Sequence, residues 1–276
     1  MLEQTFCHIP GIGEKTEHDL WAAGIHNWRE VADRPELPPR RAAVLTQYAD
    51  ESLTRLEARD VAYFSERLPA NQHWRLFPHF RDRIAYLDIE TTGLGNPGDH
   101  ITTIALYDGH TLRHYVYGDN LPEFAQDIRA YDLLVTFNGK CFDIPFIEAY
   151  FGISLPLPHI DLRYVFASLG YQGGLKNIER TLGFDRGELA DVDGYFAVIL
   201  WHDYAKRRNH AALETLIAYN MLDAINLEAL MVTAYNRKIA QTPFAESLHL
   251  PTPVAPSLPF TPDMATITRL RRNYPG

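Results

Sequence analysis

Residues 80–235 alternate between strand signals and helix signals, and this alternation constrains the fold more than any other feature of the chain. Strands are predicted by short apolar or alternating runs at 83–90, 101–107, 112–117 and 133–137. Asp108-Gly109 predicts a hairpin between the second and third of them. Helices are expected near 122–129, over 144–151, and over 211–235, which contains no Gly or Pro. A meander followed by alternating strands and helices predicts an α/β protein with a mixed sheet.

The 276 residues divide into three regions by composition. Residues 1–75 are predicted to form a small all-helical domain, with one long helical pattern from Arg40 to Leu68. Residues 80–235 form the predicted α/β domain. Residues 236–276 form a proline-rich tail, which we do not expect to form a regular helix or a central strand, because proline disrupts both. We expect the tail to lie against the folded body through its apolar residues Phe244, Leu248, Leu250, Leu258 and Phe260.

Composition excludes several classes of protein. Apolar residues make up 46% and charged residues 22%, which argues against a disordered chain. No apolar run approaches the roughly 20 residues of a membrane span. The two cysteines, Cys7 and Cys141, are far apart and form no Cys-x-x-Cys pair, which argues against a disulfide framework and a Cys-rich zinc site. We therefore expect a cytoplasmic protein that does not enter a membrane. The net charge of −9 argues against coating nucleic acid by charge alone, so any such contact should be local or bridged by metal ions.

Two carboxylates, Asp88 and Glu90, lie two residues apart at the end of the first predicted strand. Strand side chains alternate, so both point to one face. Like charges this close raise each other's pKa unless a cation lies between them, and oxygen ligands of this kind suit Mg²⁺ or Mn²⁺. By itself the pair also fits a solvated strand end.

Two further elements carry polar residues at regular spacing. Asn138-Gly139 predicts a tight turn after a buried strand, and Asp143 follows at the start of a helix, where it would also serve as an ordinary N-cap. Tyr219 and Asp223 are an i, i+4 pair on one face of the long helix, where a surface hydrogen bond is the simplest alternative.

Taken in order, these elements are Asp-x-Glu on a first strand, Asn-x-x-x-Phe-Asp after a later strand, and Tyr-x-x-x-Asp on a late helix. Over about residues 82–235 the chain resembles the DEDD-type 3′–5′ exonucleases of the ribonuclease H-like superfamily, in the variant whose last motif carries tyrosine. The string from Asp88 to Leu94 is close to that family's first motif. The resemblance implies a ribonuclease H-like fold, a mixed five-stranded sheet flanked by helices.

The resemblance also implies a set of catalytic residues. Two divalent ions, Mg²⁺ or Mn²⁺, would be held by the four carboxylates Asp88, Glu90, Asp143 and Asp223. Tyr219 would orient the attacking water. Its pKa of about 10 makes free tyrosine a poor base at neutral pH, so metal-acidified water explains the hydroxide better.

Other residues are expected to contact the nucleic acid. By resemblance, Thr91, Leu94 and Asn138 line the path of the terminal nucleotide. Lys176, near the start of a helix, would reach a phosphate or be a solvated lysine. Asp161 would support a metal ligand or cap a helix.

Near the N-terminus, the segment from Ile9 to Thr16 resembles a helix-hairpin-helix, a motif that holds nucleic-acid backbone without reading sequence. Gly11 and Gly13 would let the backbone approach a phosphate closely, and Lys15 would add positive charge. An ordinary helix–helix turn is the alternative.

These expectations describe a metal-dependent nuclease, a 3′–5′ exonuclease acting on DNA or RNA with a free 3′ end. One alternative is a structure-specific ribonuclease H-like endonuclease. Another is a nucleic-acid-binding protein without turnover.

Overall fold

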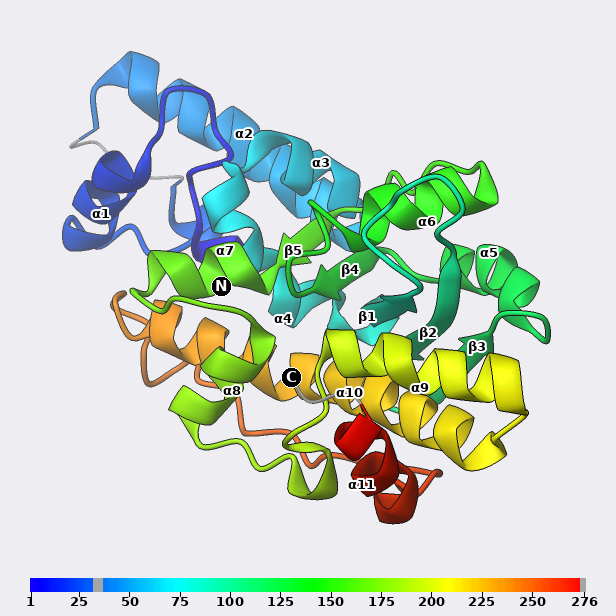
Figure 1. Cartoon of the computed structure of the whole chain (residues 1–276). Coiled ribbons are helices and arrows are strands. Elements are labelled where there is room, and N and C mark those ends of the chain that lie inside the picture. The colour runs from blue at the N-terminus through cyan, green and yellow to red at the C-terminus, as the bar shows by residue number, and fades with distance from the viewer. Residues whose placement is uncertain (32–36, 274–276) are drawn as a thin grey trace.

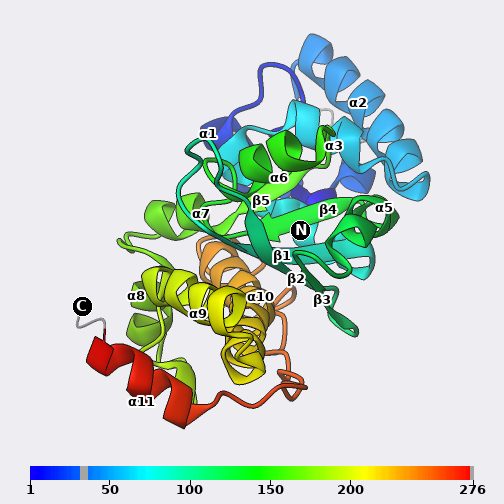
Figure 2. The same cartoon turned by 45° about the vertical axis from the view of Figure 1, so that its right-hand side comes forward.

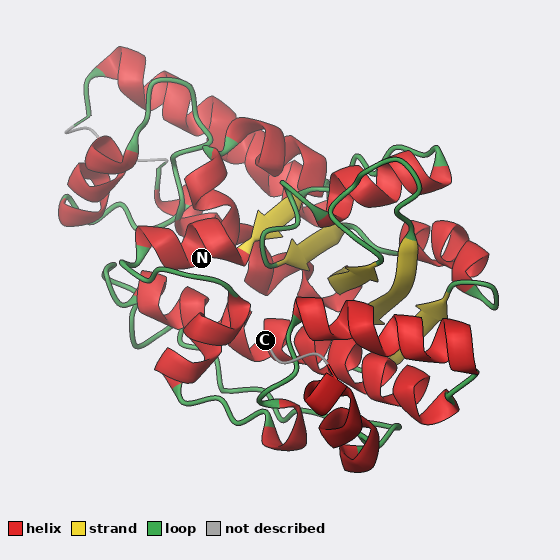
Figure 3. Cartoon of the chain, in the orientation of Figure 1, coloured by secondary structure: helices red, strands yellow, loops and turns green. Residues whose placement is uncertain are grey.

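A five-stranded sheet forms the centre of the molecule in the computed structural model, which describes residues 1–31 and 37–273 (Figure 1). The strands are β1 (Ile84–Thr91), β2 (Ile101–Tyr107), β3 (Leu112–Val116), β4 (Leu133–Thr136) and β5 (His159–Asp161). Their order is β3-β2-β1-β4-β5; β1 is antiparallel to β2 and parallel to β4. Helices flank the sheet (Figure 3), which confirms the predicted mixed five-stranded α/β architecture. The three residues of β5 are too few to produce a readable alternation, so no strand was predicted there.

The alternation of β1 separates two hydrophobic cores. Ile84 and Tyr86 belong to the larger core, whereas Ala85, Leu87 and Ile89 belong to the smaller one. The smaller core is covered by α5 (Phe124–Asp127) and α6 (Asp143–Phe151). The single helix predicted near 122–129 is instead α5 between two 3₁₀ turns, Leu121–Glu123 and Ile128–Ala130.

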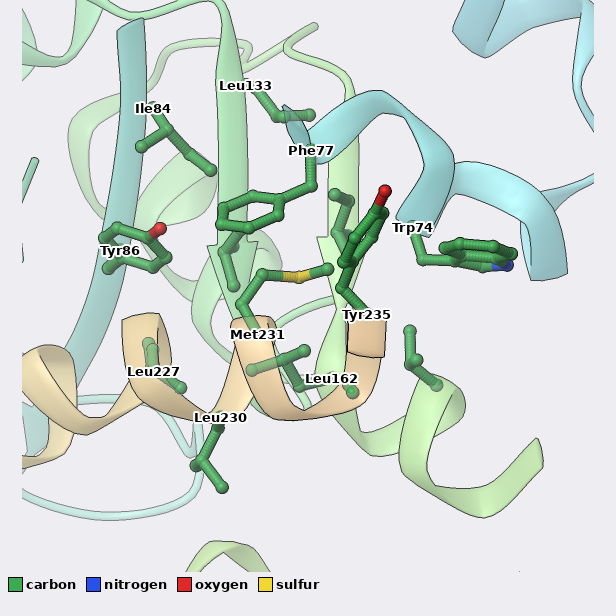
Figure 4. Close-up of a cluster of buried hydrophobic side chains, with 14 of the residues drawn as sticks. Trp74, Phe77, Ile84, Tyr86, Leu133, Leu162, Leu227, Leu230, Met231 and Tyr235 are labelled. Atoms are coloured by element: carbon green, nitrogen blue, oxygen red, sulfur yellow. The ribbon is translucent and has the colours of Figure 1, made fainter. Parts of the chain in front are cut away.

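The larger core is built on α10 (His210–Ile239), which packs across β1 and β2 and lies beside α9 (Gly194–Arg207) and α7 (Leu162–Ser168). In Figure 4, Phe77 lies over Met231 and Tyr235 of this helix. Burying each large apolar side chain contributes roughly 1.5–3 kcal/mol. Among the described helices α10 alone has the length and hydropathy of a membrane span, but 89% of its most apolar window is buried within this protein.

The N-terminal region is helical, as predicted, with α1 (Glu14–Ala22), α2 (Pro39–Glu57), α3 (Val61–Arg67), a 3₁₀ stretch (Ala70–Leu76) and α4 (Phe77–Phe80). The pattern from Arg40 to Leu68 is two helices rather than one. Arg59 has a φ of 56°, and the Asp60 carboxylate accepts a hydrogen bond from the Tyr63 amide at 3.0 Å. This cap starts a new helix where the first one ends.

This region shares the larger core with the sheet. The rings of Trp74 and Tyr235 are 5.8 Å apart, and a buried ion pair joins Arg75 to Glu17 at 2.7 Å. The Glu17 carboxylate also accepts the Phe6 amide at 2.6 Å, which fixes the chain just before the Gly-x-Gly turn. The division at residues 75 and 235 stays a prediction, because the apolar contacts run continuously across both positions.

The proline-rich segment after α10 packs on the body through the apolar residues named above. The Phe244 ring lies 5.3 Å from that of Trp21, and the Asn236 side chain forms two hydrogen bonds with the Leu250 backbone. A helix that was not predicted, α11 (Met264–Asn273), begins two residues after Pro262, where the Asp263 carboxylate accepts a hydrogen bond from the Thr266 amide. Helix α11 lies at the end of the molecule opposite α2 (Figure 2).

Candidate active site

Three carboxylates from two elements converge on the larger-core face of the sheet. Asp88 and Glu90 have the register of Ile84 and Tyr86, so they point toward α10, where Asp223 lies. One oxygen of each carboxylate lies within 4.8 Å of the other two. The predicted strand alternation and helix therefore bring the first and third motifs together.

Asn220 fixes the position of Asp88. Its amide nitrogen Nδ2 donates to Asp88 Oδ2 at 2.7 Å and to the Asp88 carbonyl oxygen at 3.1 Å. Asn220 lies inside the third motif, but the i, i+4 spacing predicts a functional role only for Tyr219 and Asp223. No local signal identified the neighbouring position as an anchor of the strand.

Asp143 is the first residue of α6 and lies beside β1. Its Oδ1 accepts a hydrogen bond from the Ile89 amide at 3.3 Å, and Phe142 occupies the N-cap position. The N-cap alternative is therefore wrong for Asp143. It is the fourth carboxylate next to the cluster, although it is not one of the three whose oxygens lie within 4.8 Å of one another.

The turn before α6 is held from two sides. A Cβ atom on Gly139 would overlap the Thr136 side chain, so only glycine fits at this position. The Asp161 carboxylate accepts hydrogen bonds from the amides of Asn138 (2.8 Å) and Lys140 (3.1 Å), and it also caps α7 through the Arg163 amide. Asp161 is thus a helix cap that also supports the turn carrying the second motif.

Burial raises the pKa values of Asp88, Glu90 and Asp143, and the charges of neighbouring carboxylates raise those of Asp88 and Glu90 further. The pKa of Asp88 is raised well above its ordinary value by burial first, and then by the charges of Asp223, Glu90 and Asp143. Burial and Asp223 raise the pKa of Glu90 in the same way. Burial raises the pKa of Asp143 to about 7, although its backbone hydrogen bonds act in the opposite direction.

Tyr219 lies one turn before Asp223, and its side chain is buried. Its pKa is raised well above 10 by burial and then by the charge of Asp223, so the phenol is protonated at neutral pH. Lys176, the second residue of α8 (Leu175–Leu182), places Nζ 4.6 Å from the centre of the Tyr219 ring. This ammonium has no hydrogen-bond partner among the described residues. Lys176 is therefore not a fully solvated lysine, and its contact with a phosphate stays a prediction.

Arg186 enters the cluster from the loop after α8, and nothing in the sequence pattern indicated it. Its Nη2 donates to Asp223 Oδ1, and its Nη1 donates to Glu179 Oε2 at 2.6 Å. The side chains of Arg186 and Glu179 are only 6% and 1% exposed. An arginine between two predicted helices is ordinarily a surface residue, so only the tertiary structure shows this contact.

The residues predicted to line the nucleotide path lie at or just after the ends of β1 and β4. Thr91 is buried, and its hydroxyl donates to the Gly93 carbonyl at 2.6 Å. Leu94 is 87% exposed and lines a groove of about 500 Å³ between the β1–β2 loop and α6. Asn138 has a φ of 68°, and its side-chain oxygen accepts from Arg163. Aromatic residues Phe142, Phe146 and Tyr150 form much of the opposite wall of this groove.

The N-terminal glycines and Lys15 lie at the start of α1, among the helices beyond the β5 edge of the sheet (Figure 1). All three residues are exposed; Gly11 has a φ of 80°, and Gly13 is the N-cap of α1. The segment before them contains a three-residue 3₁₀ turn, Leu2–Gln4, rather than an α-helix. A turn followed by a helix is present here, and both the helix-hairpin-helix motif and its role in holding nucleic acid stay predictions.

The donor set fits divalent cations. The charges of Asp223 and Asp143 raise the pKa values of Asp88 and Glu90, and all four residues offer hard oxygen ligands of the kind that Mg²⁺ and Mn²⁺ prefer. The fold and the carboxylate cluster together define the class: an α/β protein with an acidic centre on the sheet.

The chain belongs to the RNase_H superfamily, whose model matches residues 85–235. No curated protein matches the sequence. Among solved structures, the apo form of a nuclease is 20% identical, with a TM-score of 0.40 over 56% of this chain and 72% of that one. Brucella melitensis NrnC with bound Mg²⁺ is 19% identical, with a TM-score of 0.30 over 62% and 90%. The family B DNA polymerase of Pyrobaculum calidifontis is 16% identical, with a TM-score of 0.37 over 56% and 29%.

The raised pKa values predict how Mn²⁺ should stabilise the protein as pH changes. A carboxyl whose pKa is raised on folding favours the folded state below its unfolded pKa, and loses that contribution as pH rises through its folded pKa. For Asp143 this window runs from about 4 to about 7. Protons therefore replace the cation at low pH. Mn²⁺ should therefore raise the melting temperature more at pH 8 than at pH 5.5. Calorimetry with and without Mn²⁺ at each pH measures this difference. An equal rise at both pH values would contradict a metal centre at these carboxyls.

Proposed function

We propose that this protein is a metal-dependent nuclease, and specifically a 3′–5′ exonuclease that hydrolyses phosphodiester bonds of DNA or RNA from a free 3′ end. The observation that carries the proposal is the convergence of Asp88, Glu90 and Asp223 on one face of the sheet, with Asp143 beside them. These residues come from the three sequence motifs, in the order that the exonuclease resemblance requires.

The four carboxylates would hold the divalent ions, two in this proposal. When bound, such ions lower the pKa of a coordinated water and stabilise negative charge on the phosphate and the leaving oxygen. The protonated Tyr219 hydroxyl would orient the attacking water by hydrogen bonding, because its high pKa prevents it from acting as the base. The Lys176 ammonium would attract the phosphate, since it lies over the Tyr219 ring without a hydrogen-bond partner.

The groove beside Leu94 would receive the terminal nucleotide. Exposed Leu94 and the aromatic side chains opposite it offer apolar surface on which a base can stack. Base–aromatic stacking tolerates any sequence, because every base has a π-face. Thr91 at the end of β1 and Asn138 just after β4 would then fix the sugar and phosphate.

A substrate panel tests the proposal directly. Labelled single- and double-stranded DNA and RNA, linear and circular, should be incubated with Mg²⁺, with Mn²⁺ or with chelator. An exonuclease releases nucleotides one at a time from linear substrates and leaves circles intact. Cutting of circles would support the endonuclease alternative instead, and binding without metal-dependent cleavage would support a non-catalytic protein.

Replacing Asp88 tests the metal centre. Asp88→Asn keeps the shape and the contact with Asn220 but removes a charge, so we expect cleavage to fall by on the order of 100-fold or more. The control Asp50→Asn removes an exposed carboxylate from α2 and should leave the rate unchanged. Single-turnover rates measure both. A folded Asp88→Asn protein with the wild-type rate would refute the assignment.

The two motif residues of α10 should differ in importance. Tyr219→Phe removes only the hydroxyl that orients water, whereas Asp223→Asn removes a metal ligand. We therefore expect Asp223→Asn to reduce the single-turnover rate more than Tyr219→Phe does. The reverse order would show that the roles proposed for this helix are wrong.

The N-terminal turn is best tested in the full chain, because deleting residues 1–75 would expose the shared core. A Cβ atom at Gly13 contacts nothing within 4 Å, so Gly13→Ala should fold normally. If this turn holds backbone phosphate, Gly13→Ala and Lys15→Ala should weaken binding of long strands but not cleavage of a dinucleotide. Lys15→Ala should also reduce the log–log salt slope by about one.

Gly194→Ala provides a control for this experiment, because a Cβ atom there also meets nothing within 4 Å and the residue is the first of α9, one position further into its helix than Gly13 is in α1. Fluorescence anisotropy over a salt series measures affinity and slope. Unchanged values for both N-terminal variants would show that this turn does not contact nucleic acid.

A further inference from the structure

Arg186 connects the carboxylate cluster to a second buried acid. Its guanidinium donates to Asp223 through Nη2 and to Glu179 through Nη1 at 2.6 Å. A planar guanidinium can serve two carboxylates at fixed angles, which the single ammonium of lysine cannot reproduce. The orientation of the Asp223 carboxylate is therefore tied to that of Glu179.

Glu179 is itself held from α10. It lies on α8 and is fully buried, and its second oxygen accepts a hydrogen bond from Asn226 Nδ2 at 2.7 Å. Asn226 comes three residues after Asp223, on the same helix. The contacts thus form a closed ring: Asp223, Arg186, Glu179, Asn226 and back along α10 to Asp223.

The ring restricts how Asp223 can face the other carboxylates. Arg186 occupies Oδ1 of Asp223, so Oδ2 is free of this contact. Rotation of the Asp223 side chain would break a charge-assisted hydrogen bond and leave the buried Arg186 guanidinium with one partner fewer, which is costly. Outer partners of this kind commonly set the affinity of a metal site.

We propose that Arg186 is a positioning residue for the divalent-metal centre, holding Asp223 in the orientation that binds the ion, with Glu179 as its anchor. The proposal rests on the metal centre of the proposed function. It assigns to the loop after α8 a part in metal affinity that none of the three motifs contains.

Mn²⁺ binding to full-length protein, followed by electron paramagnetic resonance, tests this without any substrate. Arg186→Lys keeps the charge but loses the two-sided geometry, so the dissociation constant for Mn²⁺ should rise by about tenfold. Glu179→Gln keeps the charge of Arg186 and weakens its anchor, so affinity should fall by a smaller factor. The matched control is Arg269→Lys, because Arg269 makes a two-bond ion pair with Asp203 between α11 and α9.

Melting temperatures without metal separate this role from a purely structural one. A structural ion pair would lower the melting temperature of Arg186→Lys and leave Mn²⁺ affinity unchanged, and that result would overturn the proposal. If Arg186→Lys does not fold, the same comparison of melting temperature and Mn²⁺ affinity is made with Glu179→Gln, and an unchanged Mn²⁺ affinity in that variant would overturn the proposal. Wild-type protein that binds Mn²⁺ but cleaves nothing would refute the nuclease function while leaving the role of Arg186 open to the same measurement.

Discussion

The packing of α10 across β1 is the contact on which the rest of the structure depends. This helix of 30 residues, about 45 Å long, covers β1 and β2 on one face of the sheet. It buries apolar side chains along most of its length and meets the N-terminal helices at Tyr235 (Figure 4). The same contact brings Tyr219, Asn220 and Asp223 to the strand end that carries Asp88 and Glu90. The packing that stabilises the fold therefore also assembles the acidic centre.

Three consecutive residues of β1 organise the site. Asp88 is held by Asn220 of α10, the Ile89 amide donates to Asp143 of α6, and Glu90 faces Asp223. Each motif is thus anchored to the same strand rather than to a loop. Sites on rigid elements keep their geometry more closely than sites on loops, so little rearrangement is needed when a cation binds. The repulsion among the carboxyls is the cost of this arrangement in the free protein.

Local patterns in the sequence predicted the strands and the long helix well, because alternation and uninterrupted helical periodicity are properties of neighbouring residues. They also predicted that Asp88 and Glu90 share a face. They did not predict the break between α2 and α3, where a left-handed Arg59 and the Asp60 cap interrupt a continuous apolar pattern. Nor did they predict β5, whose three residues are a strand only because β4 pairs with them.

Arg186 and Asn220 escaped prediction for a related reason: each acts through a partner distant in sequence. Asn220 and Asp88 are 132 residues apart, and Arg186 and Asp223 are 37 apart. Short motifs identify residues that must touch the metal, because ligand chemistry restricts them to a few types. A residue that orients a ligand has no such restriction and is defined only by where the fold places it. In the proposed metal centre, α8 and the loop after it would orient the ligands that β1, α6 and α10 would supply.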